Sequence, residues 1–276
     1  MLRSAKEMEG YAVAATDGVL GHVKDFFLDD EKWVIRYLVV DTGGWLSSRK
    51  VLVSPIAVGT PDWEQRQIPV SISKEQVRNS PDIDTDQPVS RQHEVAYAGY
   101  YGYPYYWDGS GYWGGAMLPT LMMPGYSGLV GSDVQVGGDQ ARMARIEAAR
   151  REHDDPHLRS YNAVVGHHIH ASDGDIGHVA GMLIDEQTWA VRYLVVNTSN
   201  WWMGHQVLIA PQWIDAVNWY DKTVTVSVTR QAIQDAPAYD PQASMSREAE
   251  DRLYRHYGHV GYWTGYPIDE DDGSRS

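Results

Sequence analysis

The feature that most constrains the fold is an internal duplication of the chain. Residues 10–55 align without a gap with residues 166–211, at a constant offset of about 156 residues. About 19 of the 46 aligned positions are identical, and the run Arg-Tyr-Leu-Val-Val begins at both Arg36 and Arg192. A unit that occurs twice in this way is expected to form the same supersecondary structure twice.

The duplication also covers residues beyond these two segments. A Tyr-Trp pair at 106–107 recurs at the same offset at 262–263. The repeated unit is therefore longer than its first apolar core. The offset predicts that the two copies superpose with Trp33 on Trp189 and with Tyr37 on Tyr193.

Each unit has the pattern of short β-strands. In the first copy, apolar segments rich in β-branched and aromatic residues cover residues 20–28 and 33–40, with a polar turn between them. Asp17-Gly18 precedes them as a hairpin signal, because this pair tolerates positive φ. Short strands joined by tight turns predict a small antiparallel barrel in each unit. The predicted fold class is mainly β with added helices, built from two tandem small antiparallel β-barrels.

Helices are expected after each barrel. Ser73-Lys74-Glu75-Gln76 has the form of a capping box, and the segments 90–101 and 246–257 fit further helices. The predicted domains are repeat 1 (1–81), a helix with a Gly/Tyr-rich aromatic connector (82–138), a linking helix (139–158), repeat 2 (159–237), and a C-terminal helical arm with an acidic tail (238–276).

The motifs of the two units resemble a known family. They are Asp-Gly-x-x-Gly-x-Val, a Leu-Asp-Asp or Ile-Asp-Glu turn, a Leu-Val-Val strand, and a Val-Leu-Val or Val-Leu-Ile strand that leads into Pro. This pattern is similar to the PRC-barrel family, which includes the cytoplasmic barrel of the photosynthetic reaction-centre H subunit and the C-terminal domain of RimM. The resemblance covers residues 1–81 and about 162–237.

The resemblance implies a six-stranded barrel that supports or contacts other macromolecules. It implies no family-wide catalytic residues. The H subunit has a membrane helix and RimM has a preceding barrel of another type, and neither has a counterpart in this sequence. The specific partners of those two proteins therefore cannot be transferred to this protein.

Charge and composition exclude several classes of function. The formal net charge of −14 disfavours nucleic-acid binding, because a phosphate backbone repels an acidic chain. The chain has no cysteine, which removes disulfides and thiolate chemistry. No segment approaches the ~20 apolar residues of a membrane-spanning helix, and no secretory signal is recognised. We expect a cytoplasmic protein without a transmembrane segment, and peripheral association with a membrane stays open.

Histidines in the second unit are the sharpest candidate for a metal site. Alternation along a strand places His168 and His170 on one face, and His178 or Asp173 could supply a third ligand for Zn, Cu or Ni. The first copy has alanine at both strand positions. The alternative is an exposed polar strand face that binds no metal. No metal or other cofactor is assigned on spacing alone.

The sequence contains no recognisable catalytic constellation. Aspartates that recur in both copies are explained by turns, because Asp accepts hydrogen bonds from backbone N–H groups two or three residues further on; they are Asp17, Asp29, Asp173 and Asp185. Neither a Gly-x-Ser-x-Gly elbow nor a nucleotide-binding loop occurs. Arg36 and Arg192 lie inside apolar strands and are expected either to face outward or to meet a buried carboxylate. No catalytic residue is assigned.

Aromatic arms that follow each unit form the predicted interface. Aromatic rings bury large areas and keep a polar tip, and disordered linkers disfavour them. We expect each arm to dock on a barrel surface, either that of the other unit or that of a second subunit. The candidate interface residues are Tyr101, Tyr106, Trp107, Tyr257, Tyr262 and Trp263.

These features favour a function other than catalysis. The prediction is a PRC-barrel adaptor or structural protein that mediates protein–protein interaction or self-association, including at a membrane-associated complex that resembles the reaction centre. The alternative is a protein that binds a metal or another small ligand through its His-rich second repeat.

Overall fold

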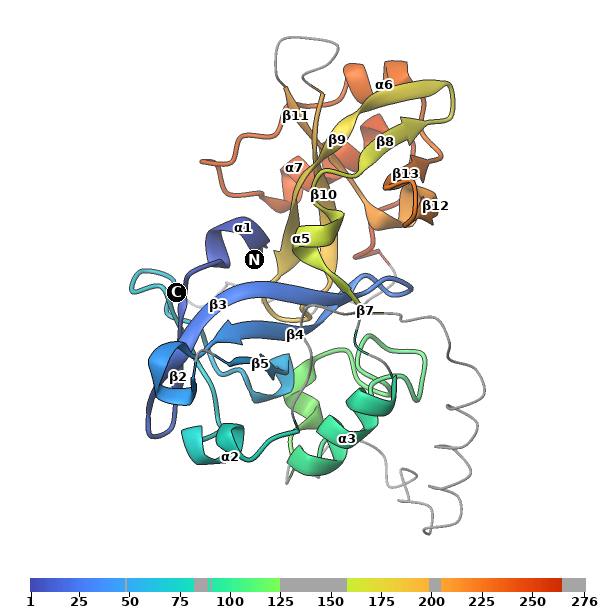
Figure 1. Ribbon diagram of the computed structural model, residues 1–276. Coiled ribbons are helices and arrows are strands. Elements are labelled where there is room, and N and C mark those ends of the chain that lie inside the picture. The colour runs from blue at the N-terminus through green and yellow to red at the C-terminus, as the bar shows by residue number, and fades with distance from the viewer. Residues whose placement is uncertain (48, 82–88, 90, 125–157, 199–204, 265–276) are drawn as a thin grey trace, which may run out of the picture.

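Each repeat contributes one β-sheet, and short helices lie at the edges of the two sheets (Figure 1). The computed structural model describes residues 1–47, 49–81, 89, 91–124, 158–198 and 205–264. The predicted fold class, mainly β with added helices, is confirmed at this level. The linking helix was predicted over residues 139–158, and residues 139–157 of it lie outside the described residues.

The sheet of repeat 1 has the strand order β5–β4–β3–β2–β6. Its strands are β2 (Ala12–Ala15), β3 (Gly18–Asp29), β4 (Val34–Asp41), β5 (Lys50–Val53) and β6 (Gln67–Pro69). All of β4 except Asp41 is buried, which explains its nearly continuous apolar sequence.

The sheet of repeat 2 repeats this arrangement, with the order β11–β10–β9–β8–β13–β12. Its strands are β8 (His168–Ala171), β9 (Gly174–Asp185), β10 (Val191–Asn197), β11 (Gln206–Ile209), β12 (Ile214–Asn218) and β13 (Thr223–Val226). Trp33 and Trp189 both lie in the turn that leads into the following strand, at φ 54° and 60°. Tyr37 and Tyr193 occupy matching places in β4 and β10, so the predicted equivalence of the two units is confirmed.

The predicted antiparallel pairing needs one correction, and closure of the barrels stays a prediction. The pairs β2–β6 and β8–β13 are parallel, so neither sheet is wholly antiparallel. Other strands of the same sheet lie between the two members of each pair in the chain, so no tight hairpin joins them, as a parallel pair requires. The strand pairings among the described residues run from one edge strand to another and do not show closure of either sheet into a barrel.

Helices follow the sheets as the sequence predicts. Ser73 accepts a hydrogen bond from the backbone N–H of Gln76, and the Gln76 side chain accepts one in return, which confirms the capping box. The α-helices are α1 (Ala5–Met8), α2 (Lys74–Arg78), α3 (Arg91–Tyr101), α5 (Tyr161–Val164), α6 (Arg230–Gln234) and α7 (Arg247–His256). The 3₁₀ turns are η1 (Gly43–Leu46), η2 (Pro55–Ala57), η3 (Pro119–Met122) and η4 (Pro211–Trp213).

The two repeats exchange their first strands. Strand β1 (Leu2–Ser4) begins repeat 1 but pairs antiparallel with β9 of repeat 2. Strand β7 (Leu158–Ser160) precedes repeat 2 but pairs antiparallel with β3 of repeat 1. Both exchanged strands have the sequence Leu-Arg-Ser. The exchange is therefore reciprocal, as in an isologous dimer formed within one chain.

Backbone hydrogen bonds at the centre of the molecule obey the same reciprocity. The Ile35 N–H donates to the Trp189 carbonyl over 2.9 Å, and the Val191 N–H donates to the Trp33 carbonyl over 2.7 Å. Buried apolar side chains from both sheets belong to one continuous cluster. The repeats thus share a core and do not form two separately packed domains.

Candidate functional site

A buried arginine lies at the same place in each repeat, next to the junction. Arg36 on β4 is fully buried, and its Nε and Nη2 donate to Oδ2 of Asp29 over 3.2 and 2.8 Å. Arg192 on β10 makes the equivalent pair with Asp185 at 3.3 and 3.0 Å. Of the two alternatives for these arginines, the buried carboxylate is the one observed.

The paired aspartates close their turns as well. Oδ1 of Asp29 accepts the backbone N–H groups of Glu31 and Lys32, each over 3.0 Å. Burial alone would raise the pKa of the Asp29 carboxyl, but the Arg36 charge and these hydrogen bonds hold it below its ordinary value. The same opposing effects, with Arg192 as the cation, lower the pKa of Asp185. Both carboxylates are committed to structure.

Each aromatic arm docks on the arginine of its own repeat. The Arg36 guanidinium lies 3.9 Å from the ring centre of Tyr106, and Arg192 lies 4.0 Å from that of Tyr262. The Tyr106 hydroxyl donates to Glu94 on α3. Among the described residues, the arms thus lie against the sheet of their own repeat, whereas they were expected from the sequence on the other unit or on a second subunit.

The remaining predicted arm residues pack beside these tyrosines. Arg91 lies 4.2 Å from the ring centre of Trp107, and Arg247 lies 4.5 Å from that of Trp263. Tyr262 donates to Glu250 on α7 over 2.8 Å. Tyr101 stacks on Tyr103 at 5.5 Å, and Tyr257 contacts Trp213 at 4.6 Å.

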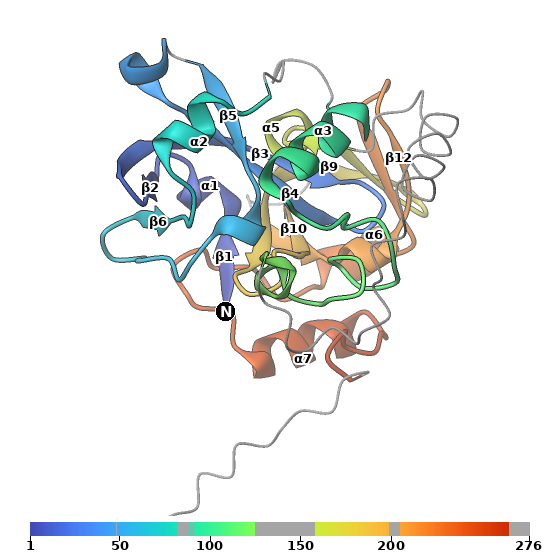
Figure 2. The ribbon, with the colours of Figure 1, turned by 90° about the horizontal axis from the view of Figure 1, so that it is seen from below.

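The connector, unlike the arms, spans both repeats. Tyr112 accepts a hydrogen bond from Arg36 through its carbonyl and one from Arg192 through its hydroxyl, the latter at 2.8 Å. Trp113 is fully buried, and its indole N–H donates to the Thr188 carbonyl over 2.8 Å. Figure 2 shows this green segment passing β4 and β10. The sequence offers no signal for this contact, because Tyr112 has no described counterpart after repeat 2.

The structure does not bring the three histidines proposed as metal ligands together at one point. His168 on β8 lies opposite His178 on β9 in the antiparallel register. Nδ1 of His170 instead pairs with Asp175 at 2.8 Å. His168 and His170 are exposed, whereas Ile169 between them is buried, as strand alternation predicts. Within the described ranges, no three His, Asp or Glu side chains form a group that could hold a metal ion.

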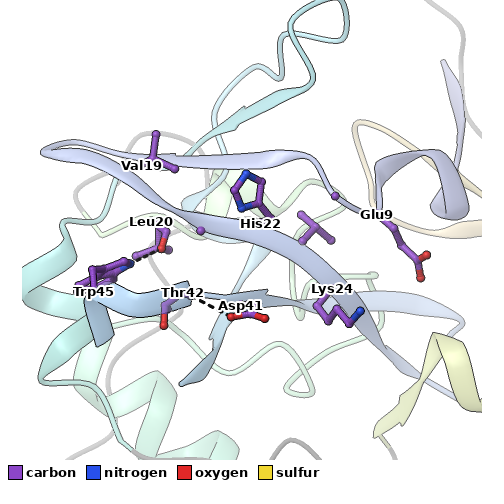
Figure 3. Close-up of a pocket in the computed structure, with 12 residues that line it drawn as sticks. Glu9, Val19, Leu20, His22, Lys24, Asp41, Thr42 and Trp45 are labelled. Atoms are coloured by element: carbon purple, nitrogen blue, oxygen red, sulfur yellow. Dashed lines mark hydrogen bonds between the residues drawn. The ribbon is translucent and has the colours of Figure 1, made fainter. Parts of the chain in front are cut away.

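A hollow of about 450 Å³ opens on the surface of repeat 1, at the start of β3 (Figure 3). Val19 and Trp45 lie at one end of it, and Glu9 and Lys24 lie at the other. The indole N–H of Trp45 donates to the Leu20 carbonyl over 2.6 Å, which holds the ring at the rim. The Trp45 ring also carries two cations, because Lys74 Nζ lies 4.5 Å and the Arg78 guanidinium 5.8 Å from its centre. Charged groups therefore flank both ends of the hollow.

A β-bulge in β3 forms the floor of this hollow. Val13 pairs with Gly21 and Ala14 pairs with Val19, so Leu20 is the additional residue in β3. The bulge leaves Val19 and His22 exposed while Leu20 is buried. A Cβ at Gly21 would lie 2.1 Å from the Asp41 carbonyl oxygen, so this close approach of two strands requires glycine.

The first repeat matches a family model. Residues 2–77 match the PRC-barrel domain. The chain contains a PRC-barrel domain. The matched residues include β1 and the five strands β2 to β6 of the sheet of repeat 1. The matched PRC-barrel domain therefore includes β1, the strand that pairs with repeat 2.

A comparison with curated proteins agrees with this assignment. An uncharacterized protein of Deinococcus radiodurans is 37% identical over 73 residues. The match covers 26% of this chain and 26% of that protein, so the chain spans about a quarter of the length of the relative it matches. The matched length is about that of a single domain. Among the described residues, no helix is long and apolar enough to cross a bilayer.

Proposed function

We propose that the protein is a non-enzymatic adaptor that holds two PRC-type units in a fixed arrangement and binds a protein partner through the hollow of repeat 1. The observation that carries this proposal is the half-exposed Val19, 50% accessible, beside Trp45 at the mouth of an open hollow. Apolar side chains gathered at an open concave surface are typical of interaction sites.

The fixed arrangement of the two units is supported by the buried ion pairs that occur in both repeats. Arg36 and Asp29, and their counterparts Arg192 and Asp185, neutralise one another beneath the aromatic arms. Such buried pairs are costly to break, because loss of one partner leaves an uncompensated charge. Exchange of β1 and β7 adds two strand pairings across the junction. We therefore assign these groups a scaffold role and assign catalysis to none of them.

The second unit supports the same proposal by its resemblance to the first. Its strands, its turn residues and its buried arginine occupy equivalent places. We infer that residues 159–237 form a second PRC-type unit, and that the two sheets act as the tandem barrels expected from the sequence. A cytoplasmic setting, self-association and attachment to a membrane-bound complex are further parts of this proposal, and they rest on the family resemblance.

The test is site-specific photo-crosslinking in cells that express the full chain. A photoreactive amino acid replaces Val19, and the matched control carries it at Asp175, the equivalent position in repeat 2. We expect position 19 to form crosslinks with one or a few proteins that position 175 does not form. Identical crosslinks at the two positions, or none at position 19, would overturn the proposed interaction site.

A further inference from the structure

The exchanged strand β7 is held to repeat 1 by an arginine as well as by its backbone. Nε of Arg159 donates to Oδ2 of Asp30 over 2.9 Å, and both side chains are mostly buried. The Arg159 guanidinium also lies 4.5 Å from the ring centre of Trp219, which directly follows β12. The face of an indole ring attracts a cation, so the position of Trp219 affects how firmly Arg159 and β7 are held.

A buried histidine packs against the same tryptophan. The ring centre of His167 lies 5.5 Å from that of Trp219, and the residue is only 2% exposed. Among the described residues, neither Nδ1 nor Nε2 of His167 has a hydrogen-bond partner. The titratable groups that act on the imidazole are Lys222 and His168, which are positive when protonated, and the Trp219 ring already holds Arg159. The surroundings of His167 thus suit a neutral imidazole.

Repeat 1 contains the same chain of contacts with one change. Arg3 of β1 donates to Glu186 over 2.9 Å and lies 4.3 Å from the ring centre of Trp63. Tyr11, which aligns with His167, has its ring centre 6.2 Å from that of Trp63. Tyrosine stays neutral below its ordinary pKa of about 10. Mild acid can therefore change the charge behind the tryptophan that supports β7, but not behind the one that supports β1.

Protonation changes what the surroundings of His167 must satisfy. An imidazolium carries two N–H donors, and a buried donor without an acceptor is costly. Trp219 is half-buried and lines a second hollow, of about 360 Å³, which is open to solvent. A movement of this ring lets the imidazolium reach water, and it also removes the surface on which Arg159 rests.

We propose that protonation of His167 displaces Trp219, loosens Arg159 and so releases β7 from β3, while β1 stays paired with β9. Burial, followed by Lys222 and His168, keeps the pKa of His167 below its ordinary 6.5, so the release takes place below that pH. Mild acid then opens the edge of β3 that β7 covers, and an open strand edge can pair with another strand. This device lies outside the hollow of repeat 1, so its test does not depend on the proposed function.

Hydrogen–deuterium exchange of the full chain at pH 8 and pH 5 tests the release. The rates are corrected for the intrinsic effect of pH on amide exchange. We expect the amides of Leu158–Ser160 to exchange at least about tenfold faster at pH 5, and those of Leu2–Ser4 to change less than about twofold. Both segments have the sequence Leu-Arg-Ser, so each molecule carries its own matched control.

Exchanging the two ring residues should transfer the effect. His167→Tyr copies repeat 1, and we expect its β7 amides to be equally protected at both pH values. Tyr11→His copies repeat 2 and should make the β1 amides sensitive to acid. Thermal melts at pH 8 show whether each variant is folded. If one is not, fluorine NMR of the wild type labelled with 5-fluorotryptophan still tests the ring movement, with the Trp219 signal assigned from Trp219→Phe.

Three results would overturn the proposal. The first is equal acid sensitivity of β1 and β7 in the wild type, or unchanged sensitivity of β7 in His167→Tyr. The second is faster exchange in β4 and β10 as well, because this shows acid unfolding of the whole core instead of release of one strand. The third is a Trp219 fluorine signal that stays the same between pH 8 and pH 5.

Discussion

The two repeats agree in their interior and differ on their surface. Both bury an arginine–aspartate pair, and both cover it with a tyrosine from the following arm. Both also place a tryptophan at positive φ in the turn between the two strands of their long hairpin. The surface positions around the bulge are instead Val19 and Lys24 in one copy and Asp175 and Ala180 in the other. After duplication, the shared scaffold leaves each copy free to present a different surface.

Loss of the buried arginine should be the strongest way to break the likeness between the repeats. Arg36 is fully buried, whereas Arg192 is slightly accessible and its partner Asp185 more so. We expect Arg36→Met to lower the free energy of unfolding by about 3–5 kcal/mol, because it leaves Asp29 as an unpaired buried charge. Arg192→Met should cost about 2 kcal/mol, in the range of a charged hydrogen bond. Denaturation with urea measures both.

A double variant separates the charge effect from lost packing. In Arg36→Met with Asp29→Asn the buried charges are both removed, while the Asn oxygen can still accept the turn hydrogen bonds. We expect it to be more stable than Arg36→Met alone. A double variant that is less stable would show that the guanidinium acts mainly by packing against Tyr106.

The Glu94 carboxyl on α3 should give the next largest effect, which is a dependence of the free energy of unfolding on pH. Burial raises the pKa of Glu94 from 4.5 to about 7, although Arg91 and the Tyr106 hydroxyl oppose the shift. The folded state therefore keeps a proton that the unfolded state loses, and the resulting stability is present below pH 4.5 and lost as the pH rises towards 7. Glu94→Gln should remove on the order of 3 kcal/mol of this pH dependence.

Urea denaturation at a series of pH values between 4.5 and 8 measures this slope. The matched variant Glu250→Gln in repeat 2 tells how far the two arms differ. If Glu94→Gln has the same pH profile as the wild type, the protonation of Glu94 does not contribute.

His167 provides a smaller contrast between the repeats. It is buried against Trp219 at 5.5 Å, and within the described part of the chain neither ring nitrogen has a hydrogen-bond partner. The equivalent pair in repeat 1 is Tyr11 with Trp63, 6.2 Å apart. Burial, followed by the charges of Lys222 and His168, lowers the pKa of His167.

This lowered pKa predicts that the contribution of His167 to stability is lost as the pH falls below 6.5, because the unfolded state then binds the proton first. Replacing His167 by the tyrosine of repeat 1 should reduce that loss, because tyrosine binds no proton in this pH range. Thermal melts at pH 5 and pH 8 measure it. A His167→Tyr variant with the acid sensitivity of the wild type would contradict the assignment.

Metal binding to the exposed histidines should be the smallest effect. His168 and His178 face one another across two strands, whereas His170 is held by Asp175. Two imidazoles without a third ligand bind Ni²⁺ weakly, so we expect millimolar Ni²⁺ to raise the melting temperature by about 1 °C or less, and His168→Ala to remove the gain. A rise of several degrees would indicate a further ligand and favour the metal-binding alternative.

The parts of this fold that could be predicted from sequence are those encoded locally. The hairpin of repeat 1, the capping box at Ser73 and the two aromatic arms all follow from residue patterns within about ten positions. The pairing of Arg36 with a carboxylate was one of two alternatives, and only the structure decides between them, because strand periodicity does not reveal which residue lies opposite a buried cation.

The exchange of strands could not be predicted, although its trace is visible in the sequence. Leu-Arg-Ser begins both copies, but a three-residue strand has no periodicity from which to infer a partner. Whether such a strand pairs with the sheet of its own repeat or with that of the other repeat depends on contacts between residues far apart in the chain. The same limit applies to Tyr112, whose two arginine contacts come from different repeats.

The exchanged strand also sets an order for synthesis on the ribosome. The backbone of Phe27, Leu28 and Asp29 can pair with Leu158–Ser160 only after these residues are translated, about 130 residues later. At ~5–20 residues per second, this delay is roughly 6–26 s. During that time the nascent first half carries an open strand edge, the kind of surface that recruits other chains. The newborn chain therefore cannot complete its first sheet until translation of the second repeat has begun.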